Sequence, residues 1–213
     1  GEQGEKYEVV LRMLSDDGEL ILPGQFLPIA EQTGQITAID RWVIQTAFQD
    51  YARLFAGAKA KIAINLSGNS LSDETLLDFV QQQFSVQAMP PERVCFEITE
   101  TKAVHNLGWA REFTREMRVL GSSVALDDFG SGMCSFRYLK DLPVNFIKID
   151  GSFVRDMLED ESNYTLVSAI NQVGQAMGIE TIAEYVHSPE IIESLRELGV
   201  DYAQGYALGM PEP

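Results

Sequence analysis

Residues 123–132 read SVALDDFGSG, and this stretch contains the two features that decide the fold. A short apolar run, Ser123–Leu126, has the length and composition of a buried strand. Two acids, Asp127 and Asp128, follow it at once, and after them comes a loop whose glycines permit unusual backbone angles or a moving lid. The stretch therefore predicts a core strand that ends in a polar loop.

Further short apolar runs occur along the chain, and stretches of helical periodicity separate them. The runs are Lys61–Leu66, Val94–Ile98, Phe146–Ile149 and Glu180–Ala183, and the helical stretches are Ile39–Phe55, Asp73–Phe84, Leu107–Leu120, Tyr164–Met177 and Ser188–Leu198. This alternation requires parallel strands joined by right-handed crossovers, either closed into a barrel or open as a doubly wound sheet. Because no GxGxxG sequence follows the first strand, a dinucleotide-binding sheet is disfavoured.

Polar residues stand where the apolar runs end, at Asn65, Glu97, Asp127 and Glu184, while Lys148 lies inside its run. In a (β/α) barrel the carboxyl ends of the strands meet at one rim, whereas in an open sheet they are spread along a line. The positions of the polar residues favour the barrel.

The acids and the amide form an all-oxygen set, which consists of Glu8, Asn65, Glu97, Asp127, Asp128 and Glu184. Such oxygens suit hard cations, so we expect two Mg²⁺ or Mn²⁺ ions rather than zinc. Taken singly, each of these acids fits a helix N-cap or a solvated loop better than a metal site. Together at a barrel mouth they would repel one another unless a cation or a shared proton compensates them, and the set therefore indicates metal.

Two basic residues have alternative interpretations. Lys148, between Ile147 and Ile149, either pairs with an acid of a neighbouring strand or orients water and stabilises charge on a phosphate. Arg12 either binds a phosphate or forms a surface ion pair with Asp16 or Asp17.

Length and composition limit the class of protein. The chain has 213 residues, is 45% hydrophobic and contains no long apolar run or signal peptide, which predicts one cytoplasmic domain. Its net charge of −16 argues against binding to nucleic-acid polymers or anionic membranes. Cys95 and Cys134 lie far apart, without zinc-ligand spacing.

Five ordered motifs resemble the signatures of the EAL family of cyclic di-GMP phosphodiesterases. They are Phe96–Glu100 (FEITE), Asp127–Gly132 (DDFGSG), Ile147–Asp150 (IKID), Ala183–Val186 (AEYV) and Gln204–Tyr206 (QGY), with Pro23–Glu31 and Asn65–Ser67 as further matches. The resemblance covers nearly the whole chain. It implies an α/β fold, a modified TIM-like (β/α) barrel with an atypical antiparallel strand near the start.

The resemblance also implies a role for each site residue. Glu8, Asn65, Glu97, Asp127 and Asp128 would ligate metal, and Glu184 and Lys148 would be catalytic. Arg12 and Gln204 would bind substrate, while Glu100 would stabilise the loop after Asp127-Asp128. The implied reaction is metal-dependent hydrolysis of cyclic di-GMP to linear pGpG, with Ca²⁺ as an inhibitor. A catalytically silent cyclic di-GMP receptor is the alternative, and an unrelated metal-dependent barrel enzyme is more remote.

Several positions depart from the family pattern. Glu8-Val9-Val10 replaces Glu-Ala-Leu, Tyr185 and His187 stand where Gly and Glu are usual, and Met133-Cys134 replaces Tyr-Ser. Nothing before Tyr7 resembles the family's opening strand. We therefore interpret residues 1–213 as a single EAL-type domain that lacks this strand and belongs to a longer signalling protein. The family implies a homodimer, upstream sensory or GGDEF domains, and a parent protein that is sometimes tethered to a membrane.

Overall fold

Strands followed by helices repeat along the chain in the computed structural model, which describes residues 6–55, 60–132 and 136–211. The chain forms two compact units, and each is interrupted in sequence by the other. The first unit comprises Gly1–Ile98 and Asn106–Ser123, and the second comprises Thr99–His105 and Val124–Pro213. The alternation of strand and helix confirms the expected α/β class.

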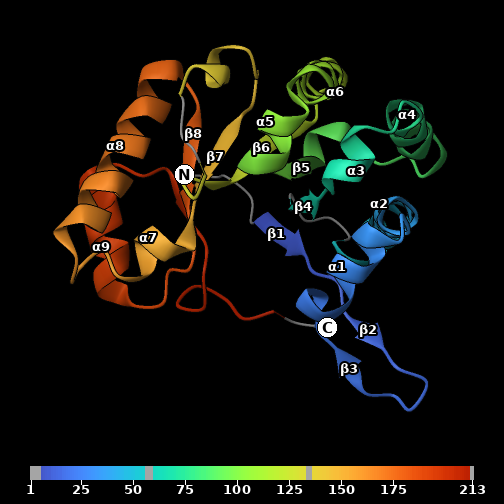
Figure 1. Ribbon diagram of the computed structural model, residues 1–213, viewed down its shortest axis with the longest axis horizontal. Coiled ribbons are helices and arrows are strands. Elements are labelled where there is room, and N and C mark those ends of the chain that lie inside the picture. The colour runs from blue at the N-terminus through green and yellow to red at the C-terminus, as the bar shows by residue number, and fades with distance from the viewer. Residues whose placement is uncertain (1–5, 56–59, 133–135, 212–213) are drawn as a thin grey trace. The chain divides into compact units, whose positions relative to one another are not determined.

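Parallel strands form the centre of the first unit. β1 (Lys6–Val9) pairs with β4 (Lys61–Asn65), and β4 pairs with β5 (Val94–Thr99). A short antiparallel pair, β2 (Met13–Leu14) with β3 (Leu20–Ile21), follows β1 and projects beyond helix α1 (Pro23–Gln32) in Figure 1. This pair confirms the antiparallel strand expected near the start.

Amphipathic helices cover these strands. They are α2 (Ile36–Leu54), α3 (Gly68–Leu71), α4 (Leu76–Val86) and α6 (Leu107–Leu120), with a 3₁₀ turn, η1 (Pro91–Arg93), before β5. In Figure 1, α2, α4 and α6 lie on one side of β4 and β5. Ile44 and Phe48 of α2 and Ile64 of β4 are fully or almost fully buried, so this interface is the core of the unit.

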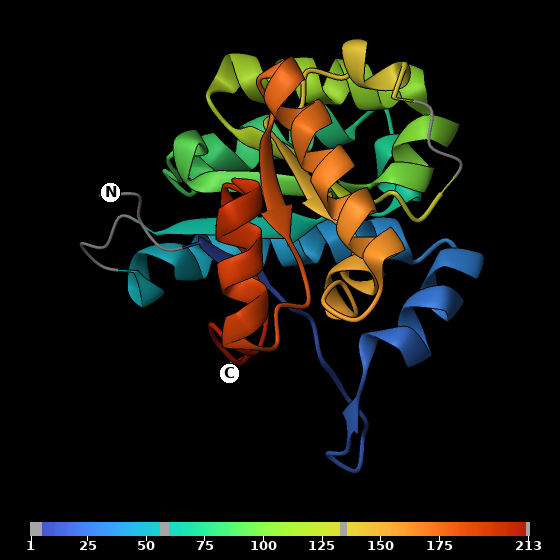
Figure 2. The same cartoon turned by 90° about the vertical axis from the view of Figure 1, so that its left-hand side faces the viewer.

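The second unit repeats the arrangement with its own parallel strands. β6 (Ser123–Phe129), β7 (Phe146–Ile149), β8 (Glu180–Ala183) and β9 (Tyr202–Ala203) are neighbours in that order. Its helices are α5 (Glu100–His105), α7 (Gly151–Arg155), α8 (Glu161–Met177) and α9 (Pro189–Leu198), with the 3₁₀ turn η2 (Tyr138–Lys140). Figures 1 and 2 show α8 and α9 side by side on one face of β7 and β8.

Local signals explain most of the helix limits. α6 has the predicted bounds because Gly121 ends it in a left-handed conformation, at φ 93°. α9 begins after Ser188, whose hydroxyl accepts from Ile191 N, and Pro189 occupies the first helical position. The predicted helix start at Asp73 is wrong, since Asp73 accepts from the backbone of Thr75 in a turn and α4 begins at Leu76.

Within the described ranges, none of the helices combines the length and the apolar character that crossing a membrane requires.

Candidate active site

Three acids of the second unit converge at the carboxyl-terminal ends of two strands. Asp127 and Asp128 lie in the last part of β6, and Glu184 directly follows β8. One carboxylate oxygen from each lies within 4.8 Å of the others. Hard divalent cations such as Mg²⁺ and Mn²⁺ prefer oxygen ligands in such an arrangement, so the donor set fits the expected metal.

The ammonium group of Lys148 lies among these acids. The Lys148 side chain is 1% exposed, and its Nζ is 2.9 Å from Glu184 Oε1 and 3.2 Å from Asp127 Oδ1. A buried lysine requires such partners, and the predicted ion pair is therefore confirmed. Three carboxylates against one ammonium leave this cluster with a surplus of negative charge, which a bound cation would offset.

The backbone beside the acids adopts an uncommon conformation. Asp128 has φ 52° and Tyr185 has φ 59°, both in the left-handed region that disfavours bulky side chains. The pairing of β6 with β7 also shifts register between Leu126 and Phe129, around the two aspartates. Bulges and strained residues of this kind redirect side chains at functional sites. Both strand ends are thus shaped to present their carboxylates.

Glu100 anchors the loop that follows the aspartates. Glu100 is 2% exposed, and its Oε2 accepts from Gly130 N at 2.9 Å while its Oε1 accepts from the Tyr138 hydroxyl. The carboxylate therefore holds both ends of the segment from Gly130 to Tyr138. This geometry agrees with a loop-stabilising role, which stays a prediction; the Met133-Cys134 departure lies outside the described residues.

The remaining expected ligands gather in the first unit. Asn65 Nδ2 donates to Glu8 Oε1 at 2.7 Å, which brings the end of β4 against β1. Asn65 and Glu97 face each other in the parallel pairing of β4 with β5, and Glu97 is 3% exposed. The structure thus places Glu8, Asn65 and Glu97 on adjacent strands, with Asn65 in contact with Glu8 and opposite Glu97, and their role as metal ligands stays a prediction.

The two expected substrate-binding residues differ in their surroundings. Gln204 lies just after β9, where its N donates to Ala183 O at 2.8 Å and its O accepts from Val186 N at 3.0 Å, so its backbone flanks Glu184 on both sides. Arg12 is exposed between β1 and β2, and its Nη1 donates to Leu11 O at 2.7 Å. The alternative ion pair of Arg12 with Asp16 or Asp17 is not found in the described part of the chain.

Sequence reasoning missed two buried residues, Tyr138 and Asp40, that contact segments carrying predicted site residues. Tyr138, which binds Glu100, lies 38 positions from it and carries no local signal. Asp40 does carry one, because it interrupts the apolar stripe of α2 that Ile36, Ile44 and Phe48 form at intervals of four residues. An acid in such a stripe indicates a buried polar partner.

Comparison with protein-family models identifies the EAL domain over residues 2–211. The chain belongs to the EAL domain family. The cyclic di-GMP phosphodiesterase PdeB of Shewanella oneidensis is 42% identical to this EAL domain over 219 residues, covering 98% of the chain and 24% of PdeB. The chain spans less than a third of the length of the curated relatives compared with it.

Solved structures place the fold in the same family. The MucR phosphodiesterase in complex with cyclic di-GMP has a TM-score of 0.91 at 33% identity, over 97% of this EAL domain and 84% of that chain. The FimX EAL domain from Pseudomonas aeruginosa, bound to cyclic di-GMP, has a TM-score of 0.92 at 34% identity, over 100% and 86%. These likenesses confirm the TIM-like fold class expected for this EAL domain.

Proposed function

We propose that this EAL domain hydrolyses cyclic di-GMP to linear pGpG with the help of Mg²⁺ or Mn²⁺. The observation that carries the proposal is the convergence of Asp127, Asp128 and Glu184 around the buried Lys148. PdeB, whose name states this phosphodiesterase activity, is similar over nearly the whole chain.

The two groups of oxygen ligands suit divalent cations. We assign metal binding to Glu8, Asn65 and Glu97 of the first unit and to Asp127 and Asp128 of the second. When bound, two cations would polarise the phosphodiester and lower the pKa of the attacking water. The donor set consists of carboxylate and amide oxygens, which favours Mg²⁺ or Mn²⁺ over softer metals. Ca²⁺ should inhibit, because its looser coordination positions the reacting groups poorly.

Glu184 and Lys148 would act directly on the reactants. Lys148 Nζ lies 2.9 Å from Glu184 Oε1, and we assign Glu184 as the general base that accepts a proton from the attacking water. The Lys148 ammonium also supplies positive charge for the phosphate oxygens. Arg12 and Gln204 would hold the substrate, whose phosphates would otherwise be repelled by a chain of net charge −16.

A receptor that binds cyclic di-GMP without cleaving it is the second candidate. FimX supports it, because its EAL domain, which has a similar fold, binds cyclic di-GMP in the solved complex. The homodimer, the upstream sensory or GGDEF domains and the cytoplasmic location of this single domain stay predictions.

The deciding experiment is chromatography of cyclic di-GMP incubated with the purified chain and Mg²⁺ or Mn²⁺, beside EDTA and Ca²⁺ samples. We expect metal-dependent pGpG formation, and Glu184→Gln should slow it by about 100-fold or more because a general base is lost. Glu180→Gln is the matched control, since Glu180 lies at the opposite end of the same strand, β8.

Calorimetric titration with cyclic di-GMP separates the two candidates. Binding without pGpG formation under every metal condition would replace the enzyme with the receptor. A Glu184→Gln variant as active as the wild type would remove Glu184 from the mechanism.

A further inference from the structure

Helix α2 carries a carboxylate at a core position. Its buried side chains are Ile36, Asp40, Ile44 and Phe48, which recur every four residues along one stripe. Asp40 is 7% exposed, although the other members of the stripe are apolar. A buried charge persists only where hydrogen bonds compensate its lost hydration, and the proposed chemistry does not use Asp40. The hydrogen-bond partners of Asp40 therefore indicate its role in the structure.

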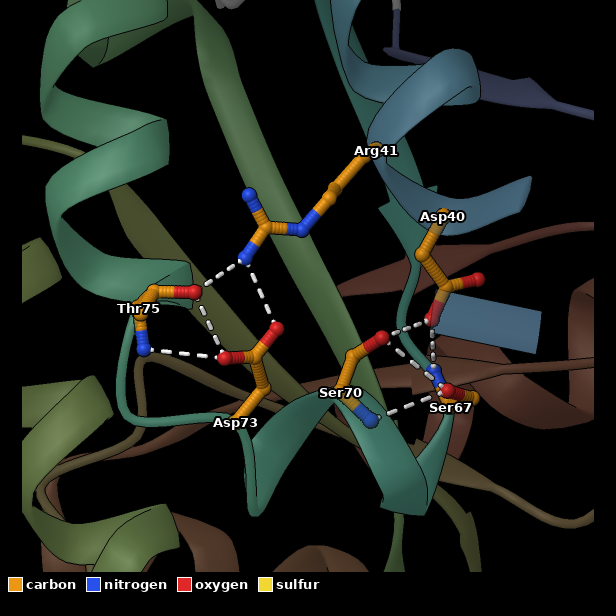
Figure 3. Close-up of polar contacts among 6 residues, drawn as sticks. All are labelled: Asp40, Arg41, Ser67, Ser70, Asp73 and Thr75. Carbon is orange, nitrogen blue, oxygen red and sulfur yellow. Dashed lines mark hydrogen bonds and ion pairs between the residues drawn. The ribbon is translucent and has the colours of Figure 1, made fainter. Parts of the chain in front are cut away.

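Both partners of Asp40 lie in the segment that follows β4. Asp40 Oδ2 accepts from Ser67 N at 2.9 Å and from Ser70 Oγ at 2.6 Å (Figure 3). Ser67 and Ser70 are themselves buried, at 7% and 1% exposure. The hydrogen bonds among Asp40, Ser67 and Ser70 are therefore buried inside the first unit.

Ser67 stands two residues beyond Asn65, at the point where the chain leaves the sheet. Leu66 N still donates to Glu97 O at 2.8 Å, as a strand residue would. Ser67 N donates to the Asp40 carboxylate instead of to a carbonyl of a neighbouring strand. Ser67 Oγ then accepts from Ser70 N and caps α3. Asp40 thus fixes both the end of β4 and the start of α3.

We propose that Asp40 is a positioning residue for Asn65 and, through it, for Glu8. The inference rests on the proposed function, because it gives Asn65 and Glu8 importance as metal ligands. By holding the backbone just after Asn65, Asp40 keeps the Asn65 amide 2.7 Å from Glu8 Oε1. Small divalent cations need ligand oxygens in a fixed geometry, and residues that orient ligands affect metal affinity strongly.

The next residue of the helix supplies an internal control. Arg41 Nη2 lies 2.7 Å from Asp73 Oδ2 and 2.6 Å from Thr75 Oγ1, in the separate cluster of Figure 3. Arg41 therefore also ties α2 to the same segment, but to its far end before α4. A change at Arg41 disturbs that end and leaves the contacts of Ser67 in place.

The first measurement needs neither metal nor substrate. In nitrogen-15 spectra of the metal-free chain, the side-chain amide resonances of Asn65 report its hydrogen bond to Glu8. Asp40→Ala should move them toward their positions in Glu8→Ala. Asp40→Asn should leave them near the wild-type positions, because its oxygen still accepts from Ser67 N. Arg41→Met should also leave them unchanged.

The second measurement is calorimetric titration of the same variants with Mn²⁺. Asp40→Ala should weaken the affinity by about 10-fold to 100-fold, the range typical for residues that orient metal ligands. Arg41→Met should bind Mn²⁺ as the wild type does.

A folded Asp40→Ala variant with wild-type Asn65 resonances would overturn the inference. If Asp40→Ala does not fold, Ser70→Ala replaces it, since that change removes one bond of the network and should shift the Asn65 resonances in the same direction. Because the resonances do not depend on metal or turnover, a chain that fails to hydrolyse cyclic di-GMP still tests the positioning role.

Discussion

Tyr185 shows how one residue can combine an unfavourable backbone with a place at the site. Its φ of 59° lies in the left-handed region, and the residue is 67% exposed. The Tyr185 Cβ also lies close to Gly151, since a Cβ added to that glycine would be 2.7 Å from it. Glycine, usual at this position in the family that the sequence resembles, would adopt this φ without strain. The tyrosine therefore stores strain directly beside Glu184.

We expect Tyr185→Gly to be more stable than Tyr185→Ala by about 1 kcal/mol, because alanine keeps the Cβ that opposes a left-handed backbone. Both variants lose the phenol ring, so the difference between their free energies of unfolding reports the backbone contribution alone. Urea unfolding of the two proteins measures it. Equal free energies of unfolding would show that Tyr185 relaxes out of the left-handed region.

Asp73 gives a prediction about pH. The hydrogen bond from the Thr75 hydroxyl, followed by the one from Arg41, lowers the pKa of Asp73 from 3.8 to about 2. A lowered carboxylate pKa stabilises the folded state above the unfolded pKa, and this contribution is lost as the pH falls through the folded pKa.

Asp73→Asn should therefore lower the free energy of unfolding at neutral pH by up to about 2 kcal/mol, with the partial exposure of the side chain reducing the effect. The difference from the wild type should shrink as the pH falls from about 4 toward 2. Urea unfolding across this range tests it, and a difference that stays constant would contradict the assigned pKa.

At the scale of elements, Gly205 allows β9 and the segment after β8 to approach closely. Its φ is 155°, and a Cβ there would lie 2.2 Å from Val186 O and 2.3 Å from Val186 N. These are backbone atoms, which cannot move aside as a flexible side chain would. The approach fixes Gln204 against the strand end that carries Glu184.

Gly205→Ala should lower the melting temperature by several degrees, in keeping with a loss of about 2 kcal/mol or more for forced overpacking. Gly209→Ala is the matched control, since no atom lies within 4 Å of a Cβ at that position. Differential scanning calorimetry of both variants provides the comparison. Equal melting temperatures of the Gly205→Ala and Gly209→Ala variants would mean that β9 moves away from Val186 without a loss of stability.

The elements also show what the sequence could predict. Val94–Ile98, Phe146–Ile149 and Glu180–Ala183 are strands as expected, because short apolar runs bounded by polar residues have few alternatives in a parallel sheet. Because Asp127, Asp128 and Glu184 stand at the carboxyl ends of parallel strands, the sequence also predicts that their side chains lie close together, as they do. The break in the apolar stripe of α2 indicates that Asp40 has a buried polar partner, but the identity of that partner, Ser67, and the left-handed φ values could not be predicted, because they depend on tertiary contacts.

For the molecule as a whole, charge is the dominant feature. The chain has 32 acidic and 16 basic residues. Mutual repulsion among the excess acids destabilises the folded state, and dissolved salt screens that repulsion.

The melting temperature of the EDTA-treated chain should therefore rise as NaCl increases from about 0.01 to about 0.5 M, where the screening length falls to a few ångströms. Adding the same ionic strength as tetramethylammonium chloride separates screening from specific sodium binding. A melting temperature that falls with both salts would show that attractive ion pairs outweigh the repulsion.

The interleaving of the two units has a practical consequence for protein dissection. Because Glu100 belongs to the second unit but is encoded before residues 106–123 of the first, a cut between residues 123 and 124 would separate it from Tyr138 and Gly130. Fragments made by such a cut should be poorly folded alone, because the Glu100 contacts form only when the two fragments are held together. The chain is thus a suitable scaffold for a split reporter, in which two fused proteins that associate would restore the Glu100 anchor.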